Sequence, residues 1–453
     1  MSHTLRPSDF VAAAEPIADQ DFSKSRKLTG TAANNAMADR LVLWALLLPV
    51  IGATFVSKIA VPAVKVDGIG MGFPLIYLAL AMAACAVGRM RLDPARLFFF
   101  CLMASVIGGM TVLWGEEISL ASLAFLMLLH LPYAVHIEGG SRVLVRLNRI
   151  FMNVATFIAL CGLAQYVLQF FVATAHVFPM ENYLPADWLV TGFNMQAPIA
   201  YGSSIYRANG IFMQEPSFFS QFLAIAVLCE LIGRGRLWRI ALYVIAILAS
   251  QSGTGLVLLA VCVPVLIVAR RRWNLLIAMA IALPLLMLLA GPYLHTDQLF
   301  ARIGEFGSER SSAYERFVGG FRIFDASVGA DPVRLLFGYG AGNYRDIVHS
   351  LNHPAAEMAL FKIVVEYGLI GTLLYFSFMM YCIFSARQPL VLRLALALTL
   401  FLNGAYNTFV HSLALALLVW PGAPTGRGSV FGEPPAEKEL PVSPGATVAR
   451  SSW

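Results

Sequence analysis

Long uninterrupted apolar runs constrain this chain more than any other feature. Examples are Leu41–Ala63, Leu97–Leu113, Ile150–Val172 and Trp273–Ala290. Runs of about 18 or more apolar residues are typical of transmembrane helices, because a helix needs that length to cross the hydrocarbon core. Only 13% of the 453 residues are charged, whereas soluble domains carry roughly 25%. The sequence therefore predicts an all-α polytopic membrane protein.

The apolar pattern predicts 11 or 12 transmembrane helices. A final apolar stretch is interrupted by Asn403–Asn407, and it counts as two spans if it forms a helical hairpin. The expected spans lie near residues 41–63, 73–88, 97–114, 118–135, 150–172, 216–233, 238–251, 253–269, 273–290, 356–385 and 389–420. We expect a disordered cytoplasmic tail over 1–40, one transmembrane domain over 41–420 and a Pro-rich disordered tail over 421–453.

Lys and Arg gather in every second loop of this arrangement. Basic loops of membrane proteins face the cytoplasm, so the N-terminus is expected there. The net charge of +6 is explained in the same way, and no nucleic acid partner is expected. Two long loops, about 173–215 and 291–355, fall on the opposite side. Their aromatic residues, glycine turns and clustered charges favour partly helical, functional loops.

The first long loop contains a single Lys or Arg, Arg207, a few residues before Glu215 and Pro216. Proline is favoured in the first turn of a helix, and a carboxylate is stabilised at a helix N-terminus. Glu215 can therefore fix Arg207 by an ion pair or act as a carboxylate base. Arg207 is predicted to bind an anionic ligand, although a snorkelling side chain or a simple Glu215 ion pair also fits.

All six basic residues of the second long loop are Arg. Planar guanidinium groups suit bidentate recognition of phosphate or carboxylate. Seven acids accompany them, so most of these arginines are expected to form ion pairs. The candidate anion-binding residues are Arg302, Arg310 and Arg316. The aromatic spacing within Ser311–Phe324 further predicts an amphipathic helix, which can lie along the membrane surface and hold a lipid-borne substrate or pack on the other helices as an ordinary lid.

Two histidines, His349 and His353, lie four residues apart just before the next span. That spacing can ligate zinc on a helix, but no third ligand and no HExxH motif stand nearby, so no metal is expected. His353 is a candidate general base or hydrogen-bond partner of a sugar hydroxyl. Glu357, one turn further on, is the second candidate. Gly338, Gly340 and Gly342 permit tight turns but form no nucleotide-binding motif, and no cofactor is expected.

Four segments in order resemble the O-antigen ligase/polymerase superfamily, the Wzy-type polysaccharide polymerases and their relatives. They are "RANGIFMQEPSFFSQFLAIAV", "SQSGTGLVLLAV", "SERSSAYERF" followed by "LLFGYGAGNY", and "FKIVVEYGLIGTLLYF", within about Tyr206–Phe376. The resemblance implies an inner-membrane enzyme of Gram-negative bacteria. Such an enzyme transfers a glycan from undecaprenyl pyrophosphate to an acceptor hydroxyl at the periplasmic face. It also implies a polysaccharide co-polymerase that regulates chain length as a partner.

The resemblance implies roles for particular residues. Arg207 and Arg310 would hold the pyrophosphate, and a histidine near the end of the second loop would be catalytic. Relatives carry a His-Asn pair where this chain has Glu357-Met358, with His353 one turn upstream. This departure favours a polymerase over a lipopolysaccharide ligase and leaves the base open between His353 and Glu357. Candidate contacts to the acceptor are His349, Tyr314 and Asn343.

Two alternative functions remain at this point. A ligase would attach the glycan to lipid A-core or to protein. A flippase for lipid-linked oligosaccharides would place charged residues and broken helices near the bilayer midplane, usually in repeated halves. The mid-span segments are nearly free of charge and no internal repeat is found. We therefore expect metal-independent, inverting glycosyl transfer between lipid-linked repeat units.

Overall fold

The structure is a computed structural model of the chain. It describes residues 37–66, 69–70, 72–137, 141–200, 202–233, 235–271, 273–290, 293, 311 and 314–421. Within these ranges the protein is mostly helical, with two small antiparallel two-stranded sheets. The helical fold class is therefore as predicted. The two predicted tails lie outside the described residues, apart from 37–40, which begin the first described helix, and Pro421.

The N-terminal half follows the predicted order of spans. After a helix over 37–53 come η2 (Pro62–Val64), β1 (Lys65–Val66), β2 (Ile69–Gly70), α2 (Gly72–Ala86), β3 (Met90–Leu92), α3 (Pro94–Trp114), α4 (Leu120–His130), η3 (Leu131–Ala134), β4 (Val135–Ile137) and α5 (Ser141–Leu168). The first long loop holds three short helices, α6 (Thr174–Val177), α7 (Pro179–Tyr183) and η4 (Ala186–Trp188).

The C-terminal half contains the second group of apolar helices and the second long loop. The helices α8 (Pro216–Ile232), α9 (Leu237–Ala249), α10 (Gly253–Arg270) and α11 (Trp273–Ala290) come first. The second loop then forms η6 (Glu315–Gly319), α14 (Gly320–Ala326), η7 (Val328–Ala330), α15 (Pro332–Phe337) and α16 (Tyr344–Leu351). The last elements are α17 (Ala359–Phe384), α18 (Leu390–Leu402), α19 (Thr408–Ala414) and η8 (Leu415–Val419).

Four of the described helices are long and apolar enough to cross a membrane: Pro94–Trp114, Val143–Leu168, Gly253–Arg270 and Ala359–Phe384. Shorter apolar helices of 10–17 residues occupy most of the other predicted spans. The final stretch forms two helices, α18 and α19, on either side of Asn403–Asn407, as predicted for a hairpin. The chain therefore carries apolar helices suited to a membrane at the positions that its sequence indicates.

The predicted first span, 41–63, differs from the structure, because its helix ends at residue 53. Lys58 lies just beyond this end and is fully buried. Its ammonium group is bonded to the Glu181 carboxylate and to the carbonyl of Ile211. A buried cation needs such partners. Lys58 therefore links the segment after the first helix to the first long loop, which supplies both of them.

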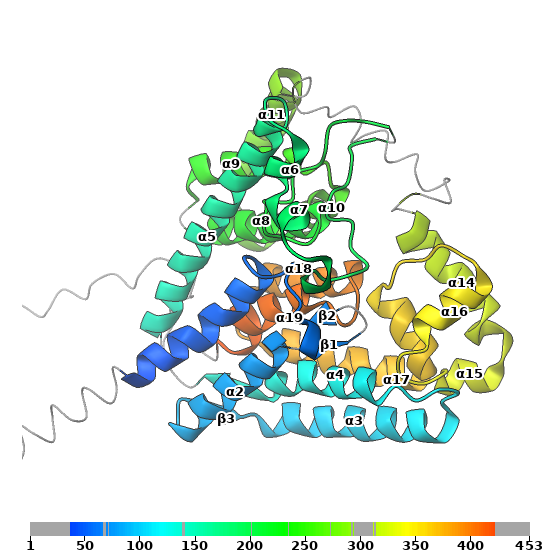
Figure 1. Cartoon of the computed structure of the whole chain (residues 1–453). Coiled ribbons are helices and arrows are strands. Elements are labelled where there is room, and N and C mark those ends of the chain that lie inside the picture. Colours follow the sequence, from blue (N-terminus) through cyan, green and yellow to red (C-terminus); the bar gives the residue numbers. More distant parts are fainter. Residues whose placement is uncertain are drawn as a thin grey trace, which may run out of the picture.

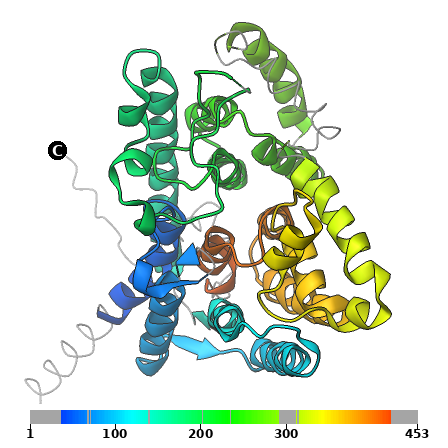
Figure 2. The same ribbon diagram turned by 45° about the vertical axis from the view of Figure 1, so that its right-hand side comes forward.

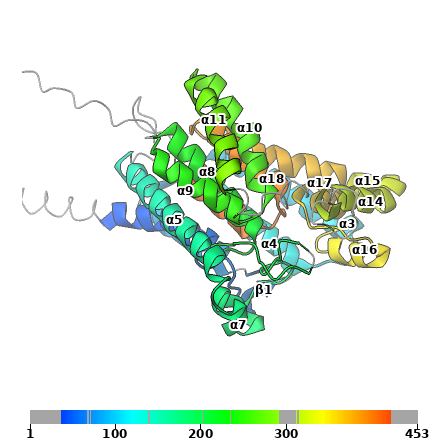
Figure 3. The same cartoon turned by 90° about the horizontal axis from the view of Figure 1, so that it is seen from above.

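Helix α8 is the centre of the molecule, since every one of its residues from Pro216 to Ile232 is buried. A helix that is apolar on all sides is typical of such a central position. It packs against α9, α10, α18 and α5. Seen from above, α5, α8, α9 and α10 lie side by side (Figure 3). The N-terminus of α8 carries Glu215, so this carboxylate is positioned by a fully buried helix.

The helices of the second loop gather beside α17 (Figure 1). They share a small apolar core with α17, which includes Ile323, Val328 and Tyr344 of the loop and Phe361 and Val365 of α17. The view turned by 45° shows this yellow group next to the orange C-terminal helices (Figure 2). The folding of both long loops agrees with the expectation that they are partly helical.

Helix α17 is broken at Gly368, whose φ of 61° and ψ of −169° are not helical. The glycine-rich turn after α15 lies against this break. The backbone N–H groups of Tyr339 and Gly340 donate to the carbonyls of Val365 and Glu366, at 3.0 and 2.8 Å. Gly338, Gly340 and Gly342 have φ of 74°, 98° and 88°, so the predicted tight turns are formed where glycine is favoured.

Candidate functional site

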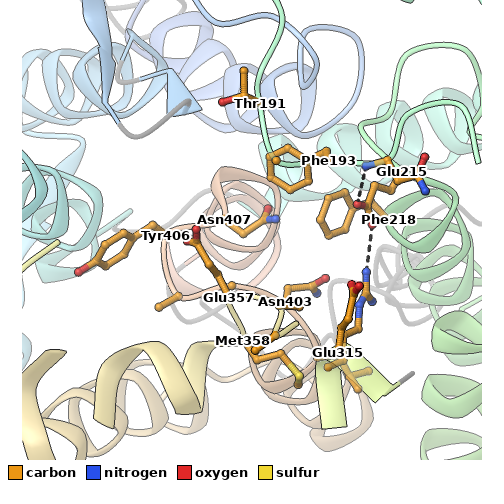
Figure 4. A pocket seen from close by; sticks show the side chains of 18 of the residues that line it. Thr191, Phe193, Glu215, Phe218, Glu315, Glu357, Met358, Asn403, Tyr406 and Asn407 are labelled. Atoms are coloured by element: carbon orange, nitrogen blue, oxygen red, sulfur yellow. Dashed lines mark hydrogen bonds and ion pairs between the residues drawn. The ribbon is translucent and has the colours of Figure 1, made fainter. Parts of the chain in front are cut away.

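A cavity of about 400 Å³ lies where the two long loops meet the start of α8. Its wall comes from segments far apart in the chain: residues 191–194 of the first loop, the start of α8, Glu315 and Arg316 of η6, Arg345 of α16, residues 355–358 and residues 402–407. Figure 4 shows these side chains around a common space. Five charged groups line it, two arginines and three glutamates.

Glu215 is the residue preceding α8 and reaches the cavity from one side (Figure 4). Its carboxylate accepts hydrogen bonds from the backbone N–H of Asn194 at 3.0 Å and from the hydroxyl of Ser217 at 2.8 Å. Arg316 donates to it at 3.0 Å. Both side chains of this ion pair are mostly buried, at 17% and 14% exposed. The alternative Glu215–Arg207 pair is therefore wrong, because Arg316 takes that place.

Arg345 and Glu357 form a second ion pair in the cavity wall. Glu357 also lies 3.5 Å from the ammonium group of Lys362, which in turn lies 2.9 Å from the Glu366 carboxylate. Burial raises the pKa of Glu357, but the charges of Lys362 and Arg345 outweigh it, and the net pKa is lowered. Glu357 is thus held ionised in a chain of alternating charges.

The inner end of this chain is fully buried. The Tyr406 hydroxyl donates to Glu366 at 3.0 Å and lies 2.6 Å from the Tyr367 hydroxyl. The Lys362 ammonium group lies 4.8 Å from the centre of the Tyr406 ring. A network of ion pairs and hydrogen bonds fixes the side chains at its ends, so Glu357 and Tyr406 line the cavity in defined positions.

Glu315 is the third carboxylate of the cavity. Its backbone carbonyl accepts a hydrogen bond from Ala356 N–H at 2.9 Å, which places η6 against the segment before α17. Burial raises the pKa of the Glu315 carboxyl group, Arg316 opposes this shift and Glu215 adds to it. Within the described ranges no ion pair or hydrogen bond of this carboxylate is found.

The structure distributes the predicted site residues unevenly. Glu215, Arg316 and Glu357 line the cavity. His353 lies half-buried in the segment that follows α16 but outside the lining, and His349 is exposed in the last turn of α16. Arg302 and Arg310 lie outside the described residues.

Two predicted acceptor contacts lie outside the cavity lining: Asn343 has hydrogen-bond partners within the protein, and the buried Tyr314 hydroxyl has none among the described residues. The Asn343 amide donates to the backbone carbonyls of Glu117 and Tyr339, at 2.8 and 3.0 Å. Tyr314 is buried under the Arg322 guanidinium, 5.4 Å from its ring centre. Neither lines the cavity.

Arg207 is half-buried and also lies outside the cavity lining. Its backbone N–H donates to Ala197, and the next N–H donates to Ala249 at the end of α9. Its Nε is buried and has no hydrogen-bond partner among the described residues. A guanidinium in this state is suited to an anion that comes from outside the chain.

No cluster of three or more His, Cys, Asp or Glu side chains that could hold a metal ion occurs in the part of the chain that the structure describes. The cavity instead offers guanidinium and carboxylate groups. Arginines bind phosphate groups, and carboxylates accept protons or hydroxyl hydrogen bonds. This combination suits a ligand with both an anionic group and hydroxyl groups.

The profile of the WcaD colanic acid polymerase family matches residues 133–421. The match covers more than half of the chain and includes every described residue of the cavity. The chain belongs to the WcaD colanic acid polymerase family. The resemblance to the Wzy-type polysaccharide polymerases is thereby confirmed. A comparison with curated proteins finds no significant match.

Membership of the WcaD family agrees with the predicted membrane glycosyltransferase of polysaccharide biosynthesis. Sequence reasoning missed Arg345, Glu315, Lys362, Glu366 and Tyr406. One signal was present, since Lys362 and Glu366 are charges four residues apart within an apolar helix. Ionisable residues inside such segments are rare and point to a site.

Proposed function

We propose that this chain polymerises oligosaccharide repeat units that are linked to undecaprenyl pyrophosphate, at the periplasmic face of the bacterial inner membrane. The product would be an exopolysaccharide of the colanic acid class. The family match supports the polymerase activity. The basic side of the membrane, as assigned from the sequence, lies opposite the two long loops that build the cavity.

The observation that carries this proposal is the pair of arginines in the cavity wall. Arg316 and Arg345 come from two separate helices of the second loop, η6 and α16, and line the same cavity. Each is held by a carboxylate, Glu215 or Glu357, so each guanidinium is oriented before a substrate arrives. A guanidinium carries five N–H donors, so each arginine can bind oxygens of a diphosphate group while it keeps its carboxylate partner. The volume of about 400 Å³ suits a sugar diphosphate headgroup.

In the proposed reaction an acceptor hydroxyl attacks the anomeric carbon of the donor sugar. The bond from this carbon to the pyrophosphate oxygen breaks, and the undecaprenyl pyrophosphate leaves with the electron pair. Arg316 and Arg345 stabilise the negative charge that develops on the leaving group. In-line attack inverts the anomeric configuration. In this proposal the arginines stabilise the leaving group, and neither a nucleotide nor a metal ion takes part in the transfer.

Arg207, Arg302 and Arg310 remain proposed partners of the pyrophosphate. For Arg207 the support is its buried Nε, which has no partner in the described ranges. Glu215, Glu357 and His353 are the candidate bases proposed from the sequence. Two of them are already engaged by arginines, and the third lies outside the cavity lining. His349, Tyr314 and Asn343 stay candidate acceptor contacts from the sequence, and a chain-length co-polymerase stays an expected partner.

A deletion strain complemented with single variants tests this proposal. Arg316→Ala and Arg345→Ala should abolish long polymer, while lipid-linked single repeat units accumulate. Arg387→Ala is the control, because Arg387 is exposed between α17 and α18 and lies outside the cavity lining. Wild-type chain lengths in both cavity variants would refute the proposal. Polymer that forms in the deletion strain but is never attached to an acceptor would instead favour a ligase.

A further inference from the structure

The cavity has five charged groups, of which four are paired with each other. Arg316 is bonded to Glu215, and Arg345 to Glu357. A carboxylate held by a guanidinium is a weak base, because the adjacent positive charge favours its ionised form. Glu315 is the fifth group, and it makes no ion pair within the described residues.

The geometry of the fold presents Glu315 to the cavity. Gly319, four residues further on in η6, lies so close to the carbonyl of Pro354 that an added Cβ would stand 2.2 Å from it. Together with the hydrogen bond from Ala356 to the Glu315 carbonyl, this contact presses η6 against residues 354–356. In Figure 4 the Glu315 side chain rises from its ribbon toward Glu215 and the cavity. The backbone at Glu315 is therefore fixed beside the cavity that its side chain lines.

We infer that Glu315 is the general base that takes the proton from the acceptor hydroxyl. This inference rests on the proposed function. The acceptor O–H bond breaks, its proton moves to the Glu315 carboxylate, and its oxygen forms the new bond to the anomeric carbon. The electron pair of the broken glycosyl–phosphate bond leaves with the pyrophosphate, beside Arg316 and Arg345. The base and the charge-stabilising groups are thus neighbours in one wall.

The charges around Glu315 agree with this role. Arg316 follows it in η6, Glu215 faces it from the start of α8, and Arg345 and Glu357 face the same cavity from α16 and from the segment before α17. Burial and Glu215 raise the pKa of Glu315 and outweigh Arg316. A base is more effective when its pKa approaches the working pH. The pKa of Glu357 is lowered, whereas that of Glu315 is raised, so the two carboxyl groups titrate in different pH ranges.

The test uses the full chain in proteoliposomes, supplied with the lipid-linked repeat units that a deletion strain accumulates. Polymer formation is measured against pH, and binding of undecaprenyl pyrophosphate is measured separately. Glu315→Gln should lose roughly 10²- to 10⁴-fold in rate, the usual contribution of a general base, and should keep its ligand binding. The acidic limb of the wild-type pH profile should disappear in this variant. Asp325→Asn, an exposed acid of α14, is the matched control.

A Glu315→Gln rate within tenfold of wild type would overturn the inference, and so would a slow variant that keeps the wild-type acidic limb. If the Glu315→Gln variant does not fold, the Glu315→Asp variant tests the inference in its place. Its rate must fall at least tenfold with ligand binding unchanged, and a rate equal to wild type overturns the inference. Failure of the proposed function looks different, because then the wild-type protein itself forms no polymer and binds no undecaprenyl pyrophosphate.

Discussion

Arg316 and Glu215 lie 101 positions apart in the chain, and their guanidinium and carboxylate groups meet at 3.0 Å in the cavity wall. This contact joins the second long loop to the N-terminus of the central helix α8. Because Glu215 pairs with Arg316, it does not pair with Arg207, which lies closer to it in the sequence. Arg207 is left without an ion pair among the described residues, and its buried Nε has no hydrogen-bond partner there.

Arg207→Ala should therefore weaken donor binding without lowering the melting temperature. A hydrogen bond to a charged group contributes about 1.5–3 kcal/mol, so the KM for the lipid-linked donor should rise roughly tenfold or more. Arg236→Ala, an exposed arginine on the predicted cytoplasmic side, is the control. A lower melting temperature with unchanged KM would show that Arg207 is structural.

Lys362→Met should destabilise the protein strongly. The substitution leaves the buried Glu366 carboxylate, 2.9 Å from the lost ammonium group, without its counter-charge. Breaking a buried ion pair on one side costs about 3–5 kcal/mol. The double variant Lys362→Met/Glu366→Gln should recover part of this loss, because no buried charge of that pair remains. Thermal unfolding in detergent measures both, and a double variant less stable than Lys362→Met would contradict the account.

Gly338→Ala should separate the glycine turn from the break in α17. Gly338 has φ of 74°, and an added Cβ would lie 2.4 Å from the carbonyl oxygen of Glu366. We expect loss of polymer together with lower stability, since the turn leads directly to the helix that carries Arg345. Gly109→Ala is the matched control, because its Cβ meets nothing within 4 Å. In the control, stability should stay equal or rise by up to about 1 kcal/mol.

Acid should remove the contribution of Glu357 to stability. Its pKa is lowered in the folded protein, so the contribution is full above the unfolded pKa and is lost as pH falls through the folded pKa. The difference in melting temperature between wild type and Glu357→Gln should shrink from about pH 6 to below about pH 4. A difference that grows toward acid pH would mean that Glu357 is not held ionised by Arg345 and Lys362.

The helices and glycine turns could be predicted from the sequence because they depend on local properties. Apolar runs fix where helices form, and glycine permits the positive φ of residues 338, 340 and 342. The end of the first helix at residue 53 could not be predicted in this way. It depends on Lys58, whose partner Glu181 is distant in the sequence. Local reasoning likewise paired Glu215 with nearby Arg207.

The cavity could be predicted only in part, because its members come from six separate segments. Arg316 and Glu357 were found from residue type and position. The sequence predicts that most arginines of the second loop form ion pairs, and Arg345 does pair with Glu357. Its place beside the cavity depends on how α16 packs on α17, which no local pattern indicates. The position of Glu315 beside the cavity could not be predicted for the same reason.

Binding of undecaprenyl pyrophosphate to the purified protein tests the central claim most directly. Native mass spectrometry can compare this lipid with undecaprenol, which lacks the diphosphate, on wild type and on the Arg316→Ala/Arg345→Ala variant. We predict that wild type prefers the diphosphate lipid by about tenfold or more and that the variant loses this preference. Equal binding of both lipids to wild type, or an unchanged preference in the variant, would contradict it.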